Sequence, residues 1–507
     1  MNARHPLSAD LSATDDGPEV PAPFTGQTMH RLPWSSIAEV SDAAAAARAA
    51  QPEWAARGHA ERRRVLLAGH DLLLERRRGL LDLLQTETGK TRGQAFEELF
   101  QAASTARYYA LGARSMLAPE RRRSGIPFVT RARVDFTPQE LVGVITPWNY
   151  PVALAAMDVL PALAAGSAVL HKADDQATLS VLMLRRAFVD AGLPADLWPV
   201  VTGPGDVIGS ALIDAVDHVC FTGSTATGAV VAERAASRLI EASLELGGKN
   251  ALLVLDGVDV EEAARTAAYA CFAAAGQLCV STERIFVEEP VADAFEAAFA
   301  RTVRGLRLGA GLDYSADVGT LTTRSQFDRV RAHVDDALAH GARIVAGGSP
   351  RPELGPWFHE PTVLADVTAQ MACFAEETFG PVVALTRVAT AEEAVSAANS
   401  SVFGLNATVL GPRRRARAIA TTLRAGSVNI GEGYRASFAS VDAPMGGWGL
   451  SGLGRRNGRE GIRRFTESRT VAETTGLLRL PTSAADFDRL TEPMVGLLIA
   501  LRRLGRR

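Results

Sequence analysis

The sequence is poor in cysteine: its 507 residues include only Cys220, Cys271, Cys279 and Cys373. They form no CxxC pair and no closely spaced framework, which argues against a disulfide-stabilised secreted domain. None of them has a histidine at the spacing of a zinc site, so the sequence predicts no metal centre. Isolated thiols of this kind are typical of a reducing compartment, and we predict a cytoplasmic protein.

Long hydrophobic runs and a large net charge are also missing. The formal charge of −3 gives no reason to expect nucleic acid as a partner. No segment approaches the roughly 20 apolar residues that cross a bilayer. The apolar run 493–501 with its basic end predicts a tail helix over 478–507, either lying on an anionic membrane surface or docked on the protein or a neighbouring subunit. We favour docking, and we interpret residues 1–25 as a flexible leader.

The chain is too long for one core of ordinary size, so two or three domains are expected. From residue 141 onward, short apolar strands alternate with helices, and a second such series follows Glu245. Alternation of this kind predicts mostly parallel sheets with ligands at the carboxyl ends of the strands. We therefore predict an α/β protein with two Rossmann-like open parallel-sheet domains that meet near residues 246–248.

One of the cysteines has unusual neighbours. Cys279 ends the segment Gly276-Gln277-Leu278-Cys279, beside a glycine that lets another backbone approach closely. An isolated cysteine is usually a small buried hydrophobe. Here the chain also offers Glu245 as a candidate base, Asn149 as a candidate oxyanion donor and Glu377 as a candidate cofactor ligand. This combination favours a dehydrogenase with a thiol nucleophile.

Two further segments are compatible with a nucleotide. Phe221-Thr222-Gly223-Ser224 follows a predicted strand and opens a helix, which suits an anion at a helix N-terminus, although a tight structural turn explains it equally well. Lys172 also follows a strand and is either a solvated charge or a donor to ribose hydroxyls. An acid beside it would repel a 2′-phosphate and so favour NAD over NADP.

These motifs occur together in an order that resembles the NAD(P)-dependent aldehyde dehydrogenase superfamily over residues 30–477. The motifs are most similar to those of the actinobacterial succinate-semialdehyde dehydrogenase-like branch of this superfamily. The resemblance implies that Cys279 attacks the aldehyde carbon, and that Asn149 with the Cys279 N–H holds the oxyanion. It implies that Glu245 activates water to cleave the thioester, whereas the acyl-CoA-forming branch generally lacks a glutamate there. A non-catalytic nucleotide-binding descendant is the alternative from another class, and retention of all three residues speaks against it.

The resemblance also implies residues for the cofactor, NAD with NADP as the alternative, and for an apolar substrate site. The cofactor residues would be Thr146, Trp148, Lys172, Asp175, Phe221, Gly223, Ser224, Leu246, Glu377 and Phe379. The substrate residues would be Tyr150, Leu154, Met157, Phe272 and Ala273. Succinate-semialdehyde enzymes hold the substrate carboxylate with arginines that this chain lacks, and a buried anion without a partner is costly. The aldehyde is therefore either succinate semialdehyde, with Arg435 as the candidate cation, or an uncharged apolar or aromatic one.

Finally, the resemblance implies a division of the chain. The cofactor domain would take residues 26–118 and 137–246, the catalytic domain 247–445, and an oligomerisation arm 119–136 and 463–477. Exposed alternating strands need a partner edge, so the arm predicts a homodimer or homotetramer.

Overall fold

The computed structural model describes residues 5–125, 129–477 and 480–505. A six-stranded sheet forms the centre of one α/β domain, in the order β19-β9-β8-β5-β6-β7. Its strands are β5 (Leu141–Ile145), β6 (Ala168–Lys172), β7 (Val200–Val201), β8 (His218–Thr222), β9 (Glu241–Glu245) and β19 (Gly452–Leu453). All pairings are parallel except that of β19, which returns to β9 from near the end of the chain.

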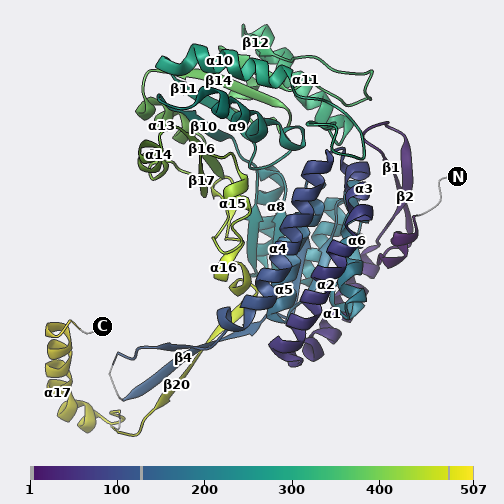
Figure 1. The fold of residues 1–507 in the computed structure, drawn as a ribbon. Coiled ribbons are helices and arrows are strands. Elements are labelled where there is room, and N and C mark those ends of the chain that lie inside the picture. Colours follow the sequence, from purple (N-terminus) through teal and green to yellow (C-terminus); the bar gives the residue numbers. More distant parts are fainter. Residues whose placement is uncertain (1–4, 126–128, 478–479, 506–507) are drawn as a thin grey trace.

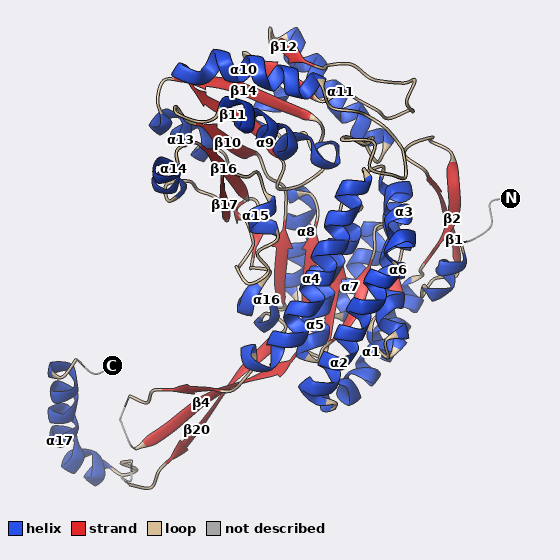
Figure 2. Cartoon of the chain, viewed as in Figure 1, coloured by secondary structure: helices blue, strands red, loops and turns tan. Residues whose placement is uncertain are grey.

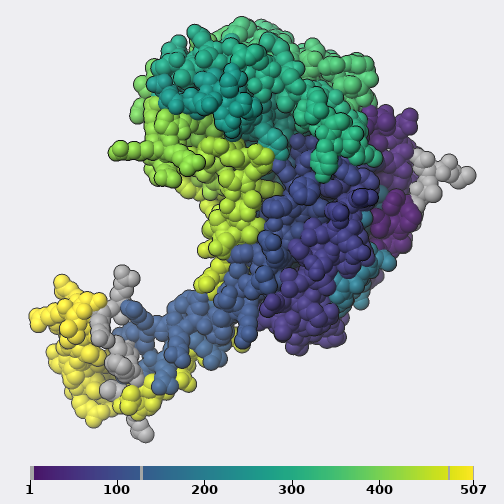
Figure 3. All heavy atoms as spheres, in the orientation of Figure 1, coloured from purple at the N-terminus to yellow at the C-terminus, as the bar shows by residue number. Residues whose placement is uncertain are grey.

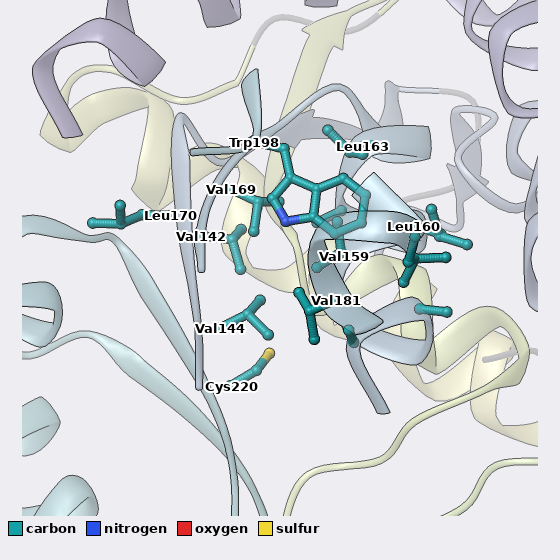
Figure 4. Packing of buried hydrophobic residues seen from close by; sticks show 14 of the residues in the cluster. Val142, Val144, Val159, Leu160, Leu163, Val169, Leu170, Val181, Trp198 and Cys220 are labelled. Carbon is teal, nitrogen blue, oxygen red and sulfur yellow. The ribbon is translucent and has the colours of Figure 1, made fainter. Parts of the chain in front are cut away.

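Helices surround this sheet (Figure 1). They are α1 (Ile37–Ala56), α2 (Gly58–Glu75), α3 (Arg77–Thr88), α4 (Arg92–Met116), α5 (Pro151–Ala165), α6 (Thr178–Asp190), α7 (Ser210–Ala215) and α8 (Thr225–Ser237). Every residue of α5 is buried, and all but Asp158 are apolar or proline. Figure 4 shows Trp198 packed among valines and leucines of β5, β6, α5 and α6 in the core of this domain.

A seven-stranded sheet forms the second domain, in the order β12-β13-β14-β11-β10-β16-β17 (Figure 2). Its strands are β10 (Asn250–Val254), β11 (Thr282–Glu288), β12 (Arg343–Ala346), β13 (Thr362–Ala365), β14 (Val382–Val388), β16 (Asn406–Leu410) and β17 (Ser427–Ile430). Only the edge strand β12 pairs antiparallel. Its main helices are α9 (Val260–Phe272), α10 (Glu289–Arg304), α11 (Arg324–Ala339), α13 (Ala391–Asn399) and α14 (Arg413–Ala420). The predicted pair of Rossmann-like parallel-sheet domains is confirmed.

A thin arm projects away from both domains (Figure 3). It consists of β3 (Glu120–Arg122), β4 (Thr130–Pro138) and β20 (Thr466–Thr474), with β4 between its two antiparallel neighbours. Residues 126–128 of the predicted arm lie outside the described residues. The short helix α16 (Gly458–Arg463) connects the body to β20, and α17 (Ala484–Arg503) lies at the far end of the arm (Figure 1).

The leader differs from the expectation, and the tail forms the expected helix without docking on its own chain. The leader is not an unstructured segment, because β1 (Asp15–Pro21) pairs with β2 (Thr28–Trp34) and buries Val20. Backbone pairing of this kind requires no long apolar run, so its absence did not reveal the hairpin. Helix α17 has no buried residue, so within one chain it is not docked on the protein. Among the described residues, no helix is both long and apolar enough to cross a membrane.

Candidate active site

A strained turn positions the candidate nucleophile at the amino end of β11. Ala274, Ala275 and Gly276 have φ values of 50°, 55° and 72°, three successive left-handed residues ahead of Cys279. A Cβ on Gly276 would lie 2.1 Å from the carbonyl oxygen of Gly380, so only glycine fits here. The turn leaves Cys279 partly exposed, whereas the other three cysteines are buried.

Asn149 lies in the turn between β5 and α5. Its Nδ2 donates a hydrogen bond of 2.8 Å to the backbone oxygen of Gln277, two residues before Cys279. This contact fixes the orientation of the amide and leaves its second N–H free for another acceptor. An oriented amide N–H beside the thiol is the geometry of an oxyanion donor.

Glu245 occupies the last position of β9, where parallel strands present ligands. Its side chain is buried, and burial raises the pKa of this carboxyl to about 7, against the opposing attraction of Arg456. A carboxyl with such a pKa exchanges protons near neutral pH, as a general base must.

The thiol of Cys279 is not activated by the protein alone. Burial raises the pKa of Cys279 to about 12, and the charges of Glu245 and Glu377 raise it further. The thiolate is the nucleophilic form, so a positive charge brought by a ligand is needed to populate it near pH 7.

These residues open onto one cleft of about 220 Å³. Its predicted lining residues are Trp148, Asn149, Gly223, Ser224, Glu245, Leu246, Cys279, Glu377 and Phe379, joined by Pro147, Thr222, Gly247, Gln326 and Arg329. The structure thus brings the candidate nucleophile, base and oxyanion donor together with six of the ten predicted cofactor residues.

The cofactor side of the cleft is built around Glu377. Its Oε1 accepts a hydrogen bond of 2.8 Å from the N–H of Gly248, and burial raises its pKa to about 7. A Cβ on Gly247 would lie 2.4 Å from Glu377 Oε2, so the glycine makes room for the carboxylate. Phe379 meets Trp148 edge-on, with ring centroids 5.7 Å apart.

Four predicted cofactor residues do not line this cleft. The hydroxyl of Thr146 is bonded to His171 Nε2 at 2.8 Å, and Phe221 is buried in β8. Lys172 ends β6, with its ammonium 3.4 Å from the carbonyl oxygen of Ala173. Lys172 and Phe221 lie on β6 and β8, the two strands that flank β5. The strand order of the sheet reverses at this point, which is where nucleotides bind in such sheets.

Both carboxylate oxygens of Asp175 accept hydrogen bonds from other residues of the protein. Its Oδ2 accepts a hydrogen bond of 2.7 Å from Trp34 Nε1, and its Oδ1 accepts one of 3.1 Å from the N–H of Gly203. The carboxylate therefore ties the hairpin β1–β2 to the sheet, a role that the sequence did not suggest.

The predicted substrate residues divide in two. Tyr150, Leu154, Met157 and Ala273 share one buried cluster, against which Cys279 packs. Phe272 instead packs in the catalytic-domain core, stacked on Phe299 with centroids 6.3 Å apart. The one-residue step from 272 to 273 is enough to turn the side chain to the other side of the helix end.

Arg435 does not offer a free guanidinium to a substrate carboxylate. Its Nε donates to Glu432 Oε1 at 2.7 Å, and half of its side chain is exposed. The expectation of an available cation at this position is therefore not met.

A buried ionic network beside Glu245 was missed by sequence reasoning. Arg456 donates to both oxygens of Asp158, at 2.8 Å and 2.5 Å, and to the hydroxyl of Thr222. Arg464 adds a 2.6 Å bond to the same carboxylate. Two arginines thus share one aspartate, and both attract the charge of Glu245. Against the effect of burial, the charges of Asp158 and then of Glu245 raise the pKa of Arg456.

Two other buried pairs hold the walls of the site. Lys90 bonds Glu98 and the backbone oxygen of Asn149. Lys249 donates to Glu283 at 2.5 Å, and Glu283 accepts from the N–H groups of Thr378 and Phe379. The lysine in Glu245-Leu246-Gly247-Gly248-Lys249 was the only sequence signal for either pair.

Two nucleotide-type sheets, with a candidate thiol nucleophile, amide donor and carboxyl base lining one cleft, fit a dehydrogenase. The family model described as "Aldehyde dehydrogenase family" matches residues 12–471. The chain belongs to the aldehyde dehydrogenase family, and it is an NAD(P)-dependent aldehyde dehydrogenase.

Individual relatives agree. A Mycobacterium ulcerans protein named "Putative succinate-semialdehyde dehydrogenase" of the NADP(+) type is 47% identical, covering 89% of this chain and 87% of its own. A crystal structure titled as an E. coli NADP dependent enzyme has a TM-score of 0.86 and 32% identity, covering 90% of this chain and 94% of that one. Betaine aldehyde dehydrogenase from Staphylococcus aureus in complex with NAD+ has a TM-score of 0.86 and 29% identity, covering 93% and 94%.

Proposed function

We propose that this enzyme oxidises an aldehyde to the free carboxylic acid, with Cys279 as nucleophile, Asn149 as oxyanion donor and Glu245 as base. The observation that carries the proposal is that all three line the same cleft of about 220 Å³. A thiolate is intrinsically nucleophilic toward a carbonyl carbon.

The residues perform the reaction in two halves. The Cys279 thiolate forms a C–S bond to the aldehyde carbon, and the carbonyl electron pair moves onto oxygen. Asn149 Nδ2 and the Cys279 N–H bind that oxyanion, and one such donor is worth about 10²–10³ in turnover. A nicotinamide dinucleotide, when bound, would supply the hydride acceptor. As the hydride leaves the carbon bonded to Cys279, the oxyanion electron pair re-forms the C=O bond, and a thioester on Cys279 remains. Glu245 then removes a proton from water, whose oxygen attacks the thioester and releases the acid and the thiolate.

The residues of the cleft fit a nicotinamide dinucleotide. The aromatic pair Trp148 and Phe379, the carboxylate of Glu377 and the N-terminus of α8 behind Ser224 would hold its nicotinamide, ribose and pyrophosphate. We propose NAD, with NADP also accepted. Asp175 retains the negative charge that disfavours a 2′-phosphate, although its oxygens are bonded to Trp34 and Gly203. The ammonium of Lys172 suits either cofactor.

The relatives' names put succinate semialdehyde forward as the substrate. The cluster beside Cys279 instead favours an aldehyde without a carboxylate, because its residues are apolar or aromatic and Arg435 is paired with Glu432. A carboxylate buried there would have no partner.

Turnover of butanal is expected to require NAD or NADP but no coenzyme A. Because Glu245 is proposed to activate water, one butanoic acid should form for each reduced cofactor. Absorbance at 340 nm and chromatography of the acid check this, with and without coenzyme A. Strict dependence on coenzyme A would contradict the hydrolytic proposal, and no turnover of any aldehyde would contradict the enzyme assignment of these residues.

We also propose that the arm and tail assemble the protein into a homodimer or homotetramer in the cytoplasm. The strand β20 is an exposed arm edge, and α17 exposes Phe487, Leu498 and Ile499 by about half of each side chain. Open edges and apolar helix faces of this kind are normally covered by a partner.

Removing residues 478–507 is expected to lower the oligomer size or weaken assembly, because it deletes the uncovered apolar helix. Light scattering of the full chain and of the truncated chain over a range of concentrations measures this. A truncation of the leader at residue 14 serves as the control. If the truncated tail variant keeps the same assembly, while the full chain binds anionic vesicles, the membrane interpretation of the tail replaces the docking one.

A further inference from the structure

Helix α4 places an unpaired acid beside the substrate cluster. Glu97 is half-buried near the start of α4, and its two carboxylate oxygens accept hydrogen bonds from the hydroxyls of Tyr269 and Tyr434. The Tyr434 bond is 2.8 Å long. Within residues 5–125, 129–477 and 480–505, Glu97 forms no ion pair, so its direct hydrogen-bond donors are two neutral hydroxyls. Burial acts to lower the pKa of both Lys90 and Arg435, and the charge of Glu97 opposes that effect at longer range.

A continuous set of contacts connects Glu97 to the reactive thiol. Tyr434 and Tyr150 belong to the buried cluster on which both Cys279 and Tyr269 pack. Tyr150 directly follows Asn149, the candidate oxyanion donor. Cys279 and Glu97 therefore contact the same cluster, Cys279 directly and Glu97 through the hydroxyls of Tyr269 and Tyr434.

Acceptors without partners lie near this acid. Gln101 and Thr105 follow Glu97 at i+4 and i+8 on α4, and therefore occupy the same helix face. Both are buried, and the side-chain amide of Gln101 and the hydroxyl of Thr105 bond to no described residue. The hydroxyl of Tyr150, also buried, has at most a weak contact with the hydroxyl of Tyr434 among the described residues. Buried polar groups without partners are rare and mark places where a ligand supplies the missing bonds.

The local charges leave one carboxylate in excess. Arg435 is bonded to Glu432, and Lys90 to Glu98. Each of the two nearby cations is thus hydrogen-bonded to its own acid, and Glu97 is a third acid that both cations attract at longer range. Three acids face two cations, which leaves one negative charge in excess. A second carboxylate brought in by a substrate would meet repulsion here, whereas a cation would meet attraction.

The aromatic rings of the cluster accept cations on their faces. The ammonium of Lys90 lies 3.9 Å from the ring centroid of Tyr150, and the guanidinium of Arg435 lies 4.1 Å from that of Tyr269. Contacts at this distance are attractive, because the face of the ring carries negative charge. Tyr434 presents a third ring, stacked on Tyr269 with centroids 6.1 Å apart.

We propose that the substrate is an aldehyde with a terminal ammonium group, and that Glu97 is the residue that selects it. The three N–H groups of the ammonium would donate hydrogen bonds to Glu97 and to neighbouring acceptors such as Gln101 and Tyr150. The same site would disfavour the carboxylate of succinate semialdehyde. This inference rests on the proposed aldehyde oxidation and names the substrate class of the same site.

A matched series of aldehydes tests the proposal: 3-aminopropanal, butanal and succinate semialdehyde share the portion OHC–CH2–CH2– and end in an ammonium, a methyl and a carboxylate group, respectively. We expect the wild-type kcat/KM to be highest for 3-aminopropanal and lowest for succinate semialdehyde. In Glu97→Gln, the ratio of kcat/KM for 3-aminopropanal to that for butanal should fall about 10- to 100-fold, the effect of one charge-assisted hydrogen bond. The ratio for succinate semialdehyde to butanal should rise.

Glu473→Gln, an exposed acid on the arm, is the matched control and should keep both ratios. A measurement on the wild type guards against a misfolded variant: propylammonium should inhibit butanal oxidation competitively, and propionate should not. Unchanged ratios in a folded Glu97→Gln, or stronger inhibition by propionate, would overturn the ammonium proposal. Those results require butanal turnover, so they are distinguishable from failure of the proposed function, in which no aldehyde is oxidised.

Discussion

Replacing Cys279 with alanine is expected to abolish aldehyde oxidation, with kcat lowered by roughly 10⁴- to 10⁶-fold, the scale seen when a covalent nucleophile is deleted. The cleft offers no second thiol, since the other three cysteines are buried elsewhere. Cofactor binding should survive, because Trp148, Glu377 and Phe379 are untouched. Reduced cofactor measured at 340 nm and quenching of tryptophan fluorescence by NAD separate the two effects.

Cys271→Ala is the matched control for that variant. Cys271 is buried in the catalytic-domain core, so its loss should cost some stability but leave the turnover near that of the wild type. A Cys279→Ala enzyme that kept more than a small fraction of wild-type turnover would show that another group forms the covalent bond.

Glu245→Gln is expected to stop the reaction halfway. Without a base for water, deacylation should slow by roughly 10²–10⁴ while the first half still runs once per site. A burst of one reduced cofactor per active site, with an acyl adduct of Cys279 in the intact mass spectrum, is the expected result. Glu241→Gln, at the exposed opposite end of β9, is the matched control. Loss of the burst itself would assign Glu245 to the first half of the reaction instead.

The pH dependence of deacylation follows from the same carboxyl. Burial raises the pKa of Glu245 to about 7 from its ordinary value near 4.5. The base must be deprotonated, so wild-type deacylation should rise with pH through about 7, and Glu245→Gln should lose this limb. The stability effect has the opposite sign: the protonated carboxyl favours the folded state, and this contribution is lost as the pH rises from about 4.5 through about 7. Glu245→Gln should therefore melt higher than the wild type at pH 8 but not at pH 4.

Much of the fold was predictable because its signals are local. Strand–turn–helix alternation from residue 141 indicated the two parallel sheets, and the carboxyl-end position of Glu245 placed it near the cleft. Side chains near the carboxyl ends of parallel strands converge, so Asn149 after β5 and Glu245 at the end of β9 were identifiable in advance as candidates. Cys279 precedes β11 and was identified instead from its motif and its resemblance to a known family.

Other features depend on residues far apart in the chain. Asp175 was expected to share a ribose, but its partner Trp34 is 141 residues away and reaches it only through the β1–β2 hairpin. The buried Asp158–Arg456 pair spans 298 residues. No pattern in a single sequence specifies such pairings, because they are set by how the domains and the returning C-terminal segment pack.

The sequence by itself therefore determined the family and the candidate chemistry: a thiol, an amide and a carboxyl in a fixed order on two α/β series, from which we predict water as the acyl acceptor. Only the tertiary structure decided what surrounds that chemistry. Glu97 lies 172 residues from Tyr269 and 337 from Tyr434, and only the packing of α4 against the catalytic domain brings the three together. Catalytic residues sit at positions that the strands dictate, whereas the charge of a substrate site is the sum of side chains brought together by the whole fold.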